Sequence, residues 1–182
     1  MKKLNLGCGS DICEDYVNVD MAPLAGVDVV CNLSRFPWPF EDEEFDEIIA
    51  KDVLEHLPDT VRVMEEIHRI TRKGGKVFLS LPYWNCWQAV TDPTHIRQFN
   101  EYTFEFFDPS KARCQRRPYY STARFSIVRQ GYGIVPFMPD FSIPYLSSYI
   151  VFYNPFLKKL VSLLANRLSN IIIGLELELK RL

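Results

Sequence analysis

The chain has 182 residues, enough for one domain with a hydrophobic core and too few for two ordinary domains. Its composition, 47% hydrophobic, 14% aromatic and 24% charged, excludes a disordered, collagen-like or coiled-coil chain. The formal net charge of -2 gives no general attraction for nucleic acid, so we expect no nucleic-acid partner. Five cysteines without regular spacing and no visible signal peptide favour reduced thiols in a cytoplasmic protein.

The first 82 residues predict an alternation of strands with loops and one helix. We expect strands at 3–6, 16–20, 28–33, 45–50 and 76–82. Residues 59–72 place apolar side chains at three-residue steps, which predicts an amphipathic helix with a glycine C-cap at 73–75. The third strand is rich in β-branched residues and is expected to be buried on both faces. Such an alternation predicts a parallel sheet covered by helices.

The second half is less regular. It predicts a short helix at 100–107, a strand at 124–134, a helix that begins at Asn154-Pro155 and a final strand at 171–182. In that last strand leucines alternate with glutamates and a lysine. Alternation indicates one polar face, so we expect this strand near a sheet edge.

Charge is distributed unevenly along the chain. Residues 41–47 hold six carboxylates in seven positions, and we expect a solvated turn before a strand there. Residues 109–139 carry no acidic side chain and six basic ones: Lys111, Arg113, Arg116, Arg117, Arg124 and Arg129. The stretch Phe141–Leu157 is uncharged, but its prolines and polar residues make it a poor membrane span.

A glycine turn after the first strand is the main functional signal. Gly7 and Gly9 lack a Cβ and let the backbone approach a ligand closely. Asp20 ends the second strand, where a carboxylate can accept hydrogen bonds from two ribose hydroxyls. The third glycine of a dinucleotide fingerprint is absent, because Gly9 is followed by Ser10-Asp11-Ile12. The pattern therefore favours a nucleoside ligand without a pyrophosphate.

An ordered series of motifs resembles the class I S-adenosylmethionine-dependent methyltransferases, especially small ones of the ubiquinone-biosynthesis-like type. The motifs are Leu4-Asn5-Leu6-Gly7-Cys8-Gly9, Tyr16-Val17-Asn18-Val19-Asp20, Phe45-Asp46-Glu47-Ile48-Ile49, Asp52-Val53-Leu54-Glu55-His56-Leu57 and Arg72-Lys73-Gly74-Gly75-Lys76-Val77. The resemblance covers residues 3–84. It is carried by the order of the motifs, which is far more specific than any one of them.

The resemblance implies a Rossmann-like, doubly wound α/β fold with a mostly parallel seven-stranded sheet and an antiparallel last strand. Residues 1–182 then form a single methyltransferase domain. Residues 1–84 are its cofactor-binding half, residues 85–170 an acceptor or lid region, and residues 171–182 the final strand. Only ten residues separate Gly9 from Asp20, so the first helix is shortened to two turns at most.

The resemblance also implies S-adenosylmethionine as the cofactor. We expect it to be bound by residues at or just after the carboxyl ends of the first four strands: Asn5, Leu6, Gly7, Cys8, Gly9, Asp20, Met21, Asn32, Leu33, Lys51 and Asp52. The chain departs from the family at Asn5 and Asn32, where an acid is usual. An asparagine can accept a hydrogen bond through its amide oxygen.

His95 is the candidate catalytic residue. It lies in a proline-containing loop, where acid–base groups are often placed, and is interpreted as a general base, with structural capping as the alternative. His56 follows Glu55 at a helix start and is interpreted mainly as a packing residue. No histidine, cysteine or carboxylate cluster has metal-ligand spacing, so the sequence predicts no metal.

We expect methyl transfer to a small-molecule or lipid- or glycan-linked acceptor. The protein's task is then to align the acceptor and exclude water. The arginines of 109–139 favour an acidic acceptor, and the apolar residues after them favour peripheral contact with an anionic membrane. Ordinary solvation and packing of these residues is the alternative. No obligate protein partner is expected.

Two functions from other classes remain open. One is a nicotinamide-dependent oxidoreductase on a similar sheet, against which the missing third glycine and the short gap between Gly9 and Asp20 both count. The other is a catalytically inactive binding module that keeps the same fold, which Asn5 and Asn32 would allow.

Overall fold

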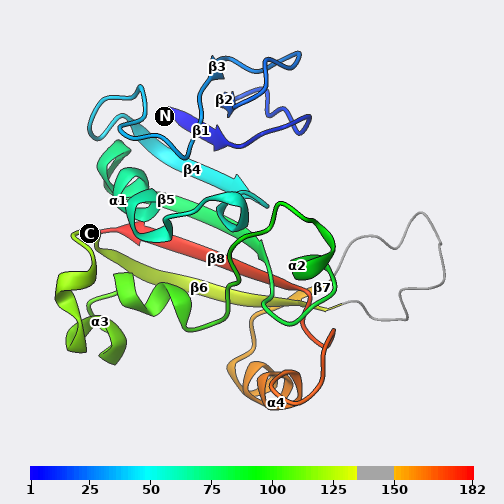
Figure 1. Ribbon diagram of the computed structural model, residues 1–182. Coiled ribbons are helices and arrows are strands. Elements are labelled where there is room, and N and C mark those ends of the chain that lie inside the picture. The colour runs from blue at the N-terminus through cyan, green and yellow to red at the C-terminus, as the bar shows by residue number, and fades with distance from the viewer. Residues whose placement is uncertain (135–149) are drawn as a thin grey trace.

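The computed structural model describes residues 1–134 and 150–182. Within these ranges the strands form one eight-stranded sheet in the order β3-β2-β1-β4-β5-β8-β6-β7 (Figure 1). The first five strands are parallel to their neighbours, β8 is antiparallel to both β5 and β6, and β7 is antiparallel to β6. The strands are β1 (Lys3–Leu6), β2 (Val17–Asp20), β3 (Val29–Val30), β4 (Phe45–Lys51), β5 (Thr71–Pro82), β6 (Phe125–Ile134), β7 (Ile150–Phe152) and β8 (Gly174–Arg181).

This sheet confirms a mostly parallel α/β fold with an antiparallel last strand, and it differs from the sequence prediction in two ways. β7 adds an eighth strand at the edge, inside the stretch that the sequence marks only as uncharged. β8 is an interior strand between β5 and β6, so the prediction of a position near an edge was wrong. The alternation in β8 has another cause, which lies in the two faces of the sheet.

One face of the sheet is apolar and carries the core. Leu4 pairs with Ile48, Ile48 with Val77, and Val77 with Leu179, so these buried side chains lie in a row across four strands on one face. The helical residues in the same core come from α1 (Thr60–Ile70), η2 (Thr103–Phe107) and α4 (Pro155–Ala165): Val63, Met64, Ile67, Ile70, Phe104, Phe107 and Ala165. The described helices that build this core therefore share one face.

The opposite face is more polar and only partly covered, with the half-buried Ile49 and Phe78 among its residues. It carries Asn5, Asn18, Glu47, Lys76, Ser80, Glu176, Glu178 and Arg129. Lys76 and Glu178 form an ion pair across strands at 3.5 Å. Within the described residues, α1, η2 and α4 are the longer helical elements whose side chains join the core on the apolar face. A half-solvated face explains why an interior strand such as β8 alternates between leucine and charged residues.

Three local predictions change in the structure. Residues 10–16, between Gly9 and β2, form turns and no helix, so the shortened first helix is absent rather than two turns long. The third strand shrinks to β3, where Val30 is 58% exposed at the sheet edge instead of buried on both faces. α1 does not end at a glycine cap. Its C-cap residue is Thr71, which is also the first residue of β5.

The remaining helices are short and lie in the second half, apart from η1 (Leu54–His56). They are α2 (Gln88–Thr91), α3 (Ala112–Arg116) and η3 (Pro118–Tyr120). The two longer helices begin as the sequence predicts. The Asp59 carboxylate accepts the Arg62 N–H at the start of α1, and the Asn154 side chain accepts two backbone N–H groups at the start of α4.

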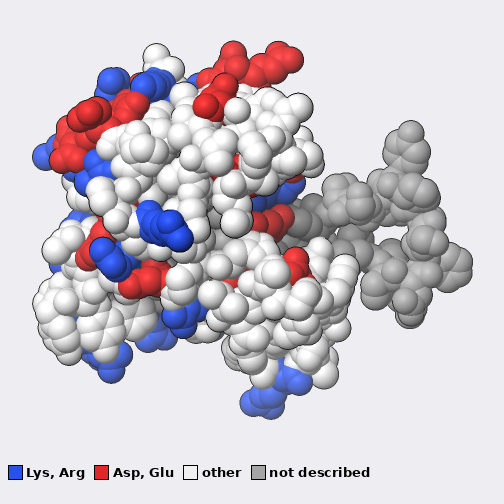
Figure 2. Space-filling view, turned by 45° about the horizontal axis from the view of Figure 1, so that its top comes forward, with Lys and Arg blue, Asp and Glu red and all other residues white. Residues whose placement is uncertain are grey.

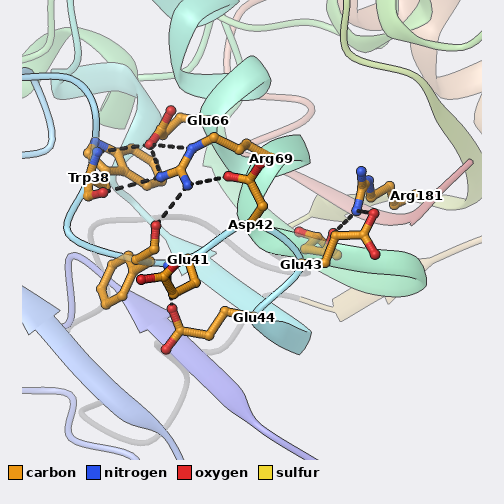
Figure 3. Close-up of polar contacts among 10 residues, drawn as sticks. Trp38, Glu41, Asp42, Glu43, Glu44, Glu66, Arg69 and Arg181 are labelled. Carbon is orange, nitrogen blue, oxygen red and sulfur yellow. Dashed lines mark hydrogen bonds and ion pairs between the residues drawn. The ribbon is translucent and has the colours of Figure 1, made fainter.

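Arg69 on α1 holds the loop between β3 and β4 (Figure 3). Its guanidinium donates to the carbonyl oxygens of Trp38 at 3.2 Å and Phe40 at 2.7 Å. It also pairs with Asp42 at 2.7 Å and with Glu66. Glu66 is 8% exposed and accepts the Trp38 N–H at 2.8 Å, so the guanidinium neutralises a largely buried carboxylate.

The acidic run at 41–47 is therefore more than a solvated turn. Four of its carboxylates form ion pairs with basic residues from other segments: Asp42 with Arg69, Glu43 with Arg181, Glu44 with Lys2 and Asp46 with Arg72. Figure 3 shows Glu43 and Arg181 facing each other beside the Arg69 cluster. These pairs fix the entry to β4 from several sides.

We predict that Arg69→Ala lowers the free energy of unfolding by about 2–3 kcal/mol, because it leaves Glu66 without its cation and frees two carbonyls. Arg72→Ala is the matched control. That side chain is 53% exposed and pairs with Asp46 near the surface, so its loss should cost about 1 kcal/mol or less. Urea unfolding of the three proteins measures both values, and equal losses would contradict the role given to Arg69.

Candidate functional site

The turn after β1 lies where the carboxyl ends of several strands meet. β1 pairs in parallel with β2 on one side and β4 on the other, so their carboxyl ends share one edge of the sheet. The Cys8 N–H donates to the Val19 carbonyl at 2.9 Å and ties the turn to β2. Gly7 and Gly9 have φ angles of 63° and 49°, which glycine adopts without strain.

The two glycines have different surroundings. A Cβ at Gly7 would lie 2.5 Å from a methyl carbon of Val53, so this glycine permits close packing. A Cβ at Gly9 would meet no atom within 4 Å. The backbone at Gly9 therefore borders open space, and a ligand can approach it there.

Asp20 is fixed beside this open space. One carboxylate oxygen accepts the Gly9 N–H at 2.9 Å, and the other accepts the Ala22 N–H at 2.9 Å. Each oxygen keeps a further lone pair for a ligand hydroxyl. A half-buried carboxylate held in this way fits a ribose diol, as the family pattern implies.

The other predicted cofactor residues of the first two strands divide into supporting and exposed positions. Asn5 is buried and donates to the Asp11 carbonyl at 2.9 Å and to Asn18 at 3.0 Å, so it holds the turn from beneath. Leu6 and Cys8 are also buried, and burial raises the pKa of the Cys8 thiol. Met21 is largely exposed at the edge.

The predicted residues after β3 and β4 lie at the same edge. Asn32 is exposed and accepts the Ser34 N–H at 2.9 Å, whereas Leu33 is buried in the core. Lys51 pairs with Asp11 at 3.3 Å. Asp52 is exposed with a φ of 52° and lines the pocket described next. The edge thus presents Gly9, Asp20, Met21, Asn32, Lys51 and Asp52, while Asn5, Leu6, Cys8 and Leu33 support it.

A pocket of about 250 Å³ opens beside Asp52. Residues 84–99 form one of its walls, because the chain turns back after β5 and the Trp84 N–H donates to the Phe99 carbonyl at 2.9 Å. The lining residues come from η1, β5, α2, the following loop and the start of β8: Asp52, Glu55, His56, Leu81, Pro82, Gln88, Asp92, His95, Ile173 and Gly174. His95, the predicted base, therefore lies in the pocket next to the cofactor edge.

Glu55 is the residue of this pocket that the sequence did not single out. It is 1% exposed, and neither carboxylate oxygen has a hydrogen-bond partner among the described residues. Burial raises its pKa to about 7. His95 Nε2 lies 3.9 Å from a Glu55 oxygen, and the rings of His56 and His95 are 4.6 Å apart. His56 thus contributes to the pocket as well as to packing. The only sequence signal was the adjacency of Glu55 and His56.

Most basic residues of 109–139 lie at the other end of the sheet. Phe125 pairs with Arg181 and Ser126 pairs with Lys180. Lys180 also pairs with Lys76, near the end of the sheet where the parallel strands begin. Residues just before Phe125 therefore lie away from the pocket. Arg124 donates to three backbone carbonyls there. The part of region 85–170 next to the pocket is the segment 84–99, and residues 135–149 lie outside the described residues.

Comparison with known proteins agrees with this geometry. A family model described as a methyltransferase domain matches residues 5–79. The structure of a SAM-dependent methyltransferase from Archaeoglobus fulgidus superposes with a TM-score of 0.65 at 14% identity, over 99% of this chain and 86% of that one. A SAM-dependent methyltransferase from Thermotoga maritima gives 0.62 at 11% identity, over 100% and 82%. Residues 5–79 thus match a methyltransferase domain, and the fold of the chain is similar to that of solved SAM-dependent methyltransferases.

Curated relatives match less than half of this chain. The ubiquinone biosynthesis O-methyltransferase of Pseudomonas syringae is 29% identical over 43% of this chain and 43% of its own length. The demethylmenaquinone methyltransferase of Streptomyces griseus is 26% identical over 46% and 39%. The chain thus spans less than half the length of these relatives. Family and fold imply S-adenosylmethionine as cofactor, and the oxidoreductase and inactive-module alternatives gain no support.

The surroundings of the two glycines give a stability prediction. An alanine at either position pays about 1–2 kcal/mol for its positive φ. Gly7→Ala must also displace Val53, so we expect a total loss of about 2–4 kcal/mol. Gly9→Ala should show only the backbone cost, since its Cβ enters open space. Denaturant unfolding measures the difference, and an equal loss at both positions would refute the open space at Gly9.

Proposed function

We propose that this protein transfers the methyl group of S-adenosylmethionine to a small or lipid-linked acceptor that enters the pocket at His95. The observation that carries the proposal is the fixed Asp20 carboxylate beside the open space at Gly9. Asp52 follows β4 at that edge and also lines the pocket, so the cofactor edge and the pocket are adjacent. Adjacent sites are what direct transfer between two bound molecules requires.

The chain's own residues have simple tasks in this reaction. Asp20 would accept the ribose hydroxyls, and the backbone at Gly9 would lie against the nucleoside. When bound, S-adenosylmethionine supplies a methyl group already activated by the positive charge on sulfur. The exposed Asn32 and Met21 would contact the adenine side, and Asp52 the amino-acid end. Rate acceleration then comes mainly from alignment and exclusion of water.

The pocket suits the reacting part of a small acceptor. Its volume of about 250 Å³ admits a ring or a short chain but no folded macromolecule. Leu81, Pro82 and Ile173 offer an apolar wall, while Gln88 and His95 offer polar groups that can orient a hydroxyl or amine. A hydroxyl or amine acceptor must lose a proton during transfer, and His95 lies where such a proton would leave.

We predict that Asp20→Ala weakens binding of S-adenosylhomocysteine about 10–100-fold, because it removes charge-assisted hydrogen bonds to the ribose. Gly9→Val should abolish binding while the domain stays folded. Asp15→Ala removes the same charge from an exposed position of the same turn and is the matched control. Calorimetric titration measures the affinities, and unchanged binding by Asp20→Ala would refute this cofactor site. Formation of S-adenosylhomocysteine from S-adenosylmethionine, dependent on a small-molecule or lipid extract, tests the transfer itself.

A second observation favours peripheral contact with an anionic membrane, which we propose to occur through α4. Five apolar residues of α4, and Leu168 just after it, are exposed: Phe156, Leu157, Leu160, Leu163, Leu164 and Leu168. The surface around α4 is mostly uncharged, with basic side chains at its tip (Figure 2). No helix among the described residues is long and apolar enough to cross a membrane. An apolar helix face beside cations is typical of binding along a membrane surface.

The attachment of α4 to the domain supports this orientation. The Ser162 hydroxyl donates to the buried Glu101 at 2.6 Å, and Glu101 also accepts the Tyr83 hydroxyl at 2.7 Å. Lys158 donates to the Gln130 carbonyl at 2.7 Å, so it serves the fold. Lys159 and Arg167 are exposed and free to meet anionic headgroups. The polar side of α4 is thus used internally, and its leucines point outward.

We predict salt-sensitive sedimentation of the protein with phosphatidylglycerol-containing vesicles and none with pure phosphatidylcholine. Leu163→Asp should abolish sedimentation by placing a charge in the apolar face. Val30→Asp makes the same change at an exposed valine of β3, away from α4, and should sediment normally. Absence of vesicle binding at low salt would contradict the membrane proposal and leave cofactor binding unaffected.

A further inference from the structure

We infer that Glu55, His56 and His95 form a binding site for a divalent transition-metal ion in the wall of the acceptor pocket. One donor atom from each of the three residues lies within 4.8 Å of the other two. A metal at about 2.1 Å from three donors brings them to about 3–3.5 Å from one another. Modest side-chain rotation therefore closes the site. Glu55 Oε1 and His95 Nε2 are already 3.9 Å apart.

The unpaired carboxylate of Glu55 is the second, independent observation. Glu55 is more than nine-tenths buried, and its carboxylate accepts no hydrogen bond from any described residue. A separation of 3.9 Å from His95 is too long for a hydrogen bond. A buried carboxylate without a donor is costly, and a bound cation would remove that cost.

The pocket has no positive charge of its own to neutralise Glu55. Its described lining includes three carboxylates, those of Asp52, Glu55 and Asp92, and contains no lysine or arginine. The two imidazoles are the only basic groups in this lining. The charge balance therefore favours a divalent cation over an anionic ligand.

Thr94 and Asp92 orient His56 as a metal ligand. The Thr94 hydroxyl donates to Asp92 at 2.6 Å, which leaves its oxygen to accept from His56 Nδ1 at 2.9 Å. His56 then carries its proton on Nδ1 and presents the Nε2 lone pair. Such outer hydrogen bonds fix the tautomer and orientation of metal-bound histidines in general.

The backbone holds the two halves of the site together. The Glu55 carbonyl accepts the Ile96 N–H at 2.9 Å and the Arg97 N–H at 3.1 Å. These bonds fasten the loop of His95 onto η1, although 38 residues lie between His56 and His95 in the sequence. The ligands are therefore placed by the fold before any ion binds. The prediction of no metal rested on sequence spacing, which cannot register this contact.

The donor set indicates the class of ion and its role. Two imidazoles and one carboxylate suit Zn²⁺, Fe²⁺, Co²⁺ or Mn²⁺ and leave coordination positions open toward the pocket. An acceptor hydroxyl at an open position would release its proton to water more readily. Its oxygen would then bond to the methyl carbon as the carbon–sulfur bond breaks, with the electron pair staying on sulfur. This role rests on the proposed methyl transfer, whereas binding of the ion does not.

Metal binding also decides the part played by His95. Once its lone pair coordinates an ion, the imidazole is no longer free to take a proton from the acceptor. His95 then positions the metal instead of acting as the general base that the sequence analysis predicts. Without an ion, the base role stands.

The test is titration of the tag-free, chelator-treated protein with Co²⁺ and with Zn²⁺. We expect one equivalent of Co²⁺ to bind with visible d–d absorption bands, and Zn²⁺ to displace it. Glu55→Gln and His95→Gln should abolish the bands. Thr94→Val removes the hydroxyl that bonds His56 and Asp92 but no metal ligand, and it should weaken binding about 10–100-fold.

Two controls separate this site from adventitious binding and from the cofactor site. His68→Gln changes a half-buried histidine on α1 that accepts from Arg181 at 3.4 Å, and it should bind Co²⁺ normally. Asp20→Ala should bind Co²⁺ normally while losing affinity for S-adenosylhomocysteine, and His95→Gln should show the reverse. Thermal unfolding checks that each variant is folded. If Glu55→Gln is unfolded, the result for His95→Gln decides the test. Failure of the parent to bind, or equal binding by His95→Gln, would overturn the metal site.

Discussion

Parallel pairing of β1 with both β2 and β4 is the constraint on which the rest of the molecule depends. It aligns three carboxyl ends, so that each chain reversal beyond them must occur at the same edge. The turn after β1 has no room for a side chain at Gly7 against Val53, and it exposes backbone at Gly9. The edge that results is a ligand site because of sheet geometry, before any particular side chain is considered.

The domain packs α1, η2 and α4 into the core on one face of the sheet. Its second face is made stable in water by polar side chains that pair across strands, such as Lys76 with Glu178. A partly solvated face needs no helices between the first strands, and the short turn from Gly9 to Asp20 is sufficient. The pocket is built separately, from residues 84–99 folded back against η1. The cofactor edge and the pocket thus have different structural origins. Short turns after the strands form the edge, whereas the segment 84–99, which folds back against η1, forms the pocket.

Local chemistry determined what could be predicted from the sequence. Asp59 and Asn154 begin helices because their side chains accept backbone N–H groups of residues two or three positions further on. Gly9 and Asp20 could be found because each lies at the end of a strand that is itself recognisable from its sequence. The position of β8 could not be predicted, since the alternation of its residues reports a polar face and not a place in the strand order. Glu55 and His95 lie close together because the loop of His95 forms backbone hydrogen bonds to η1. The spacing of residues in the sequence does not predict such a contact. The cofactor edge was therefore predictable, and the centre of the pocket was not.

The interior position of β8 governs when this domain can assemble. β5 and β6 do not pair with each other. Within the described sheet, β8 (residues 174–181) lies between them and pairs with both. The β5–β8 pairings span about a hundred residues, as between Leu79 and Leu177. Contacts so distant in sequence close late and slowly. During synthesis, the apolar faces of β5 and β6 therefore stay incomplete until these residues emerge, and until then the nascent chain presents open strand edges.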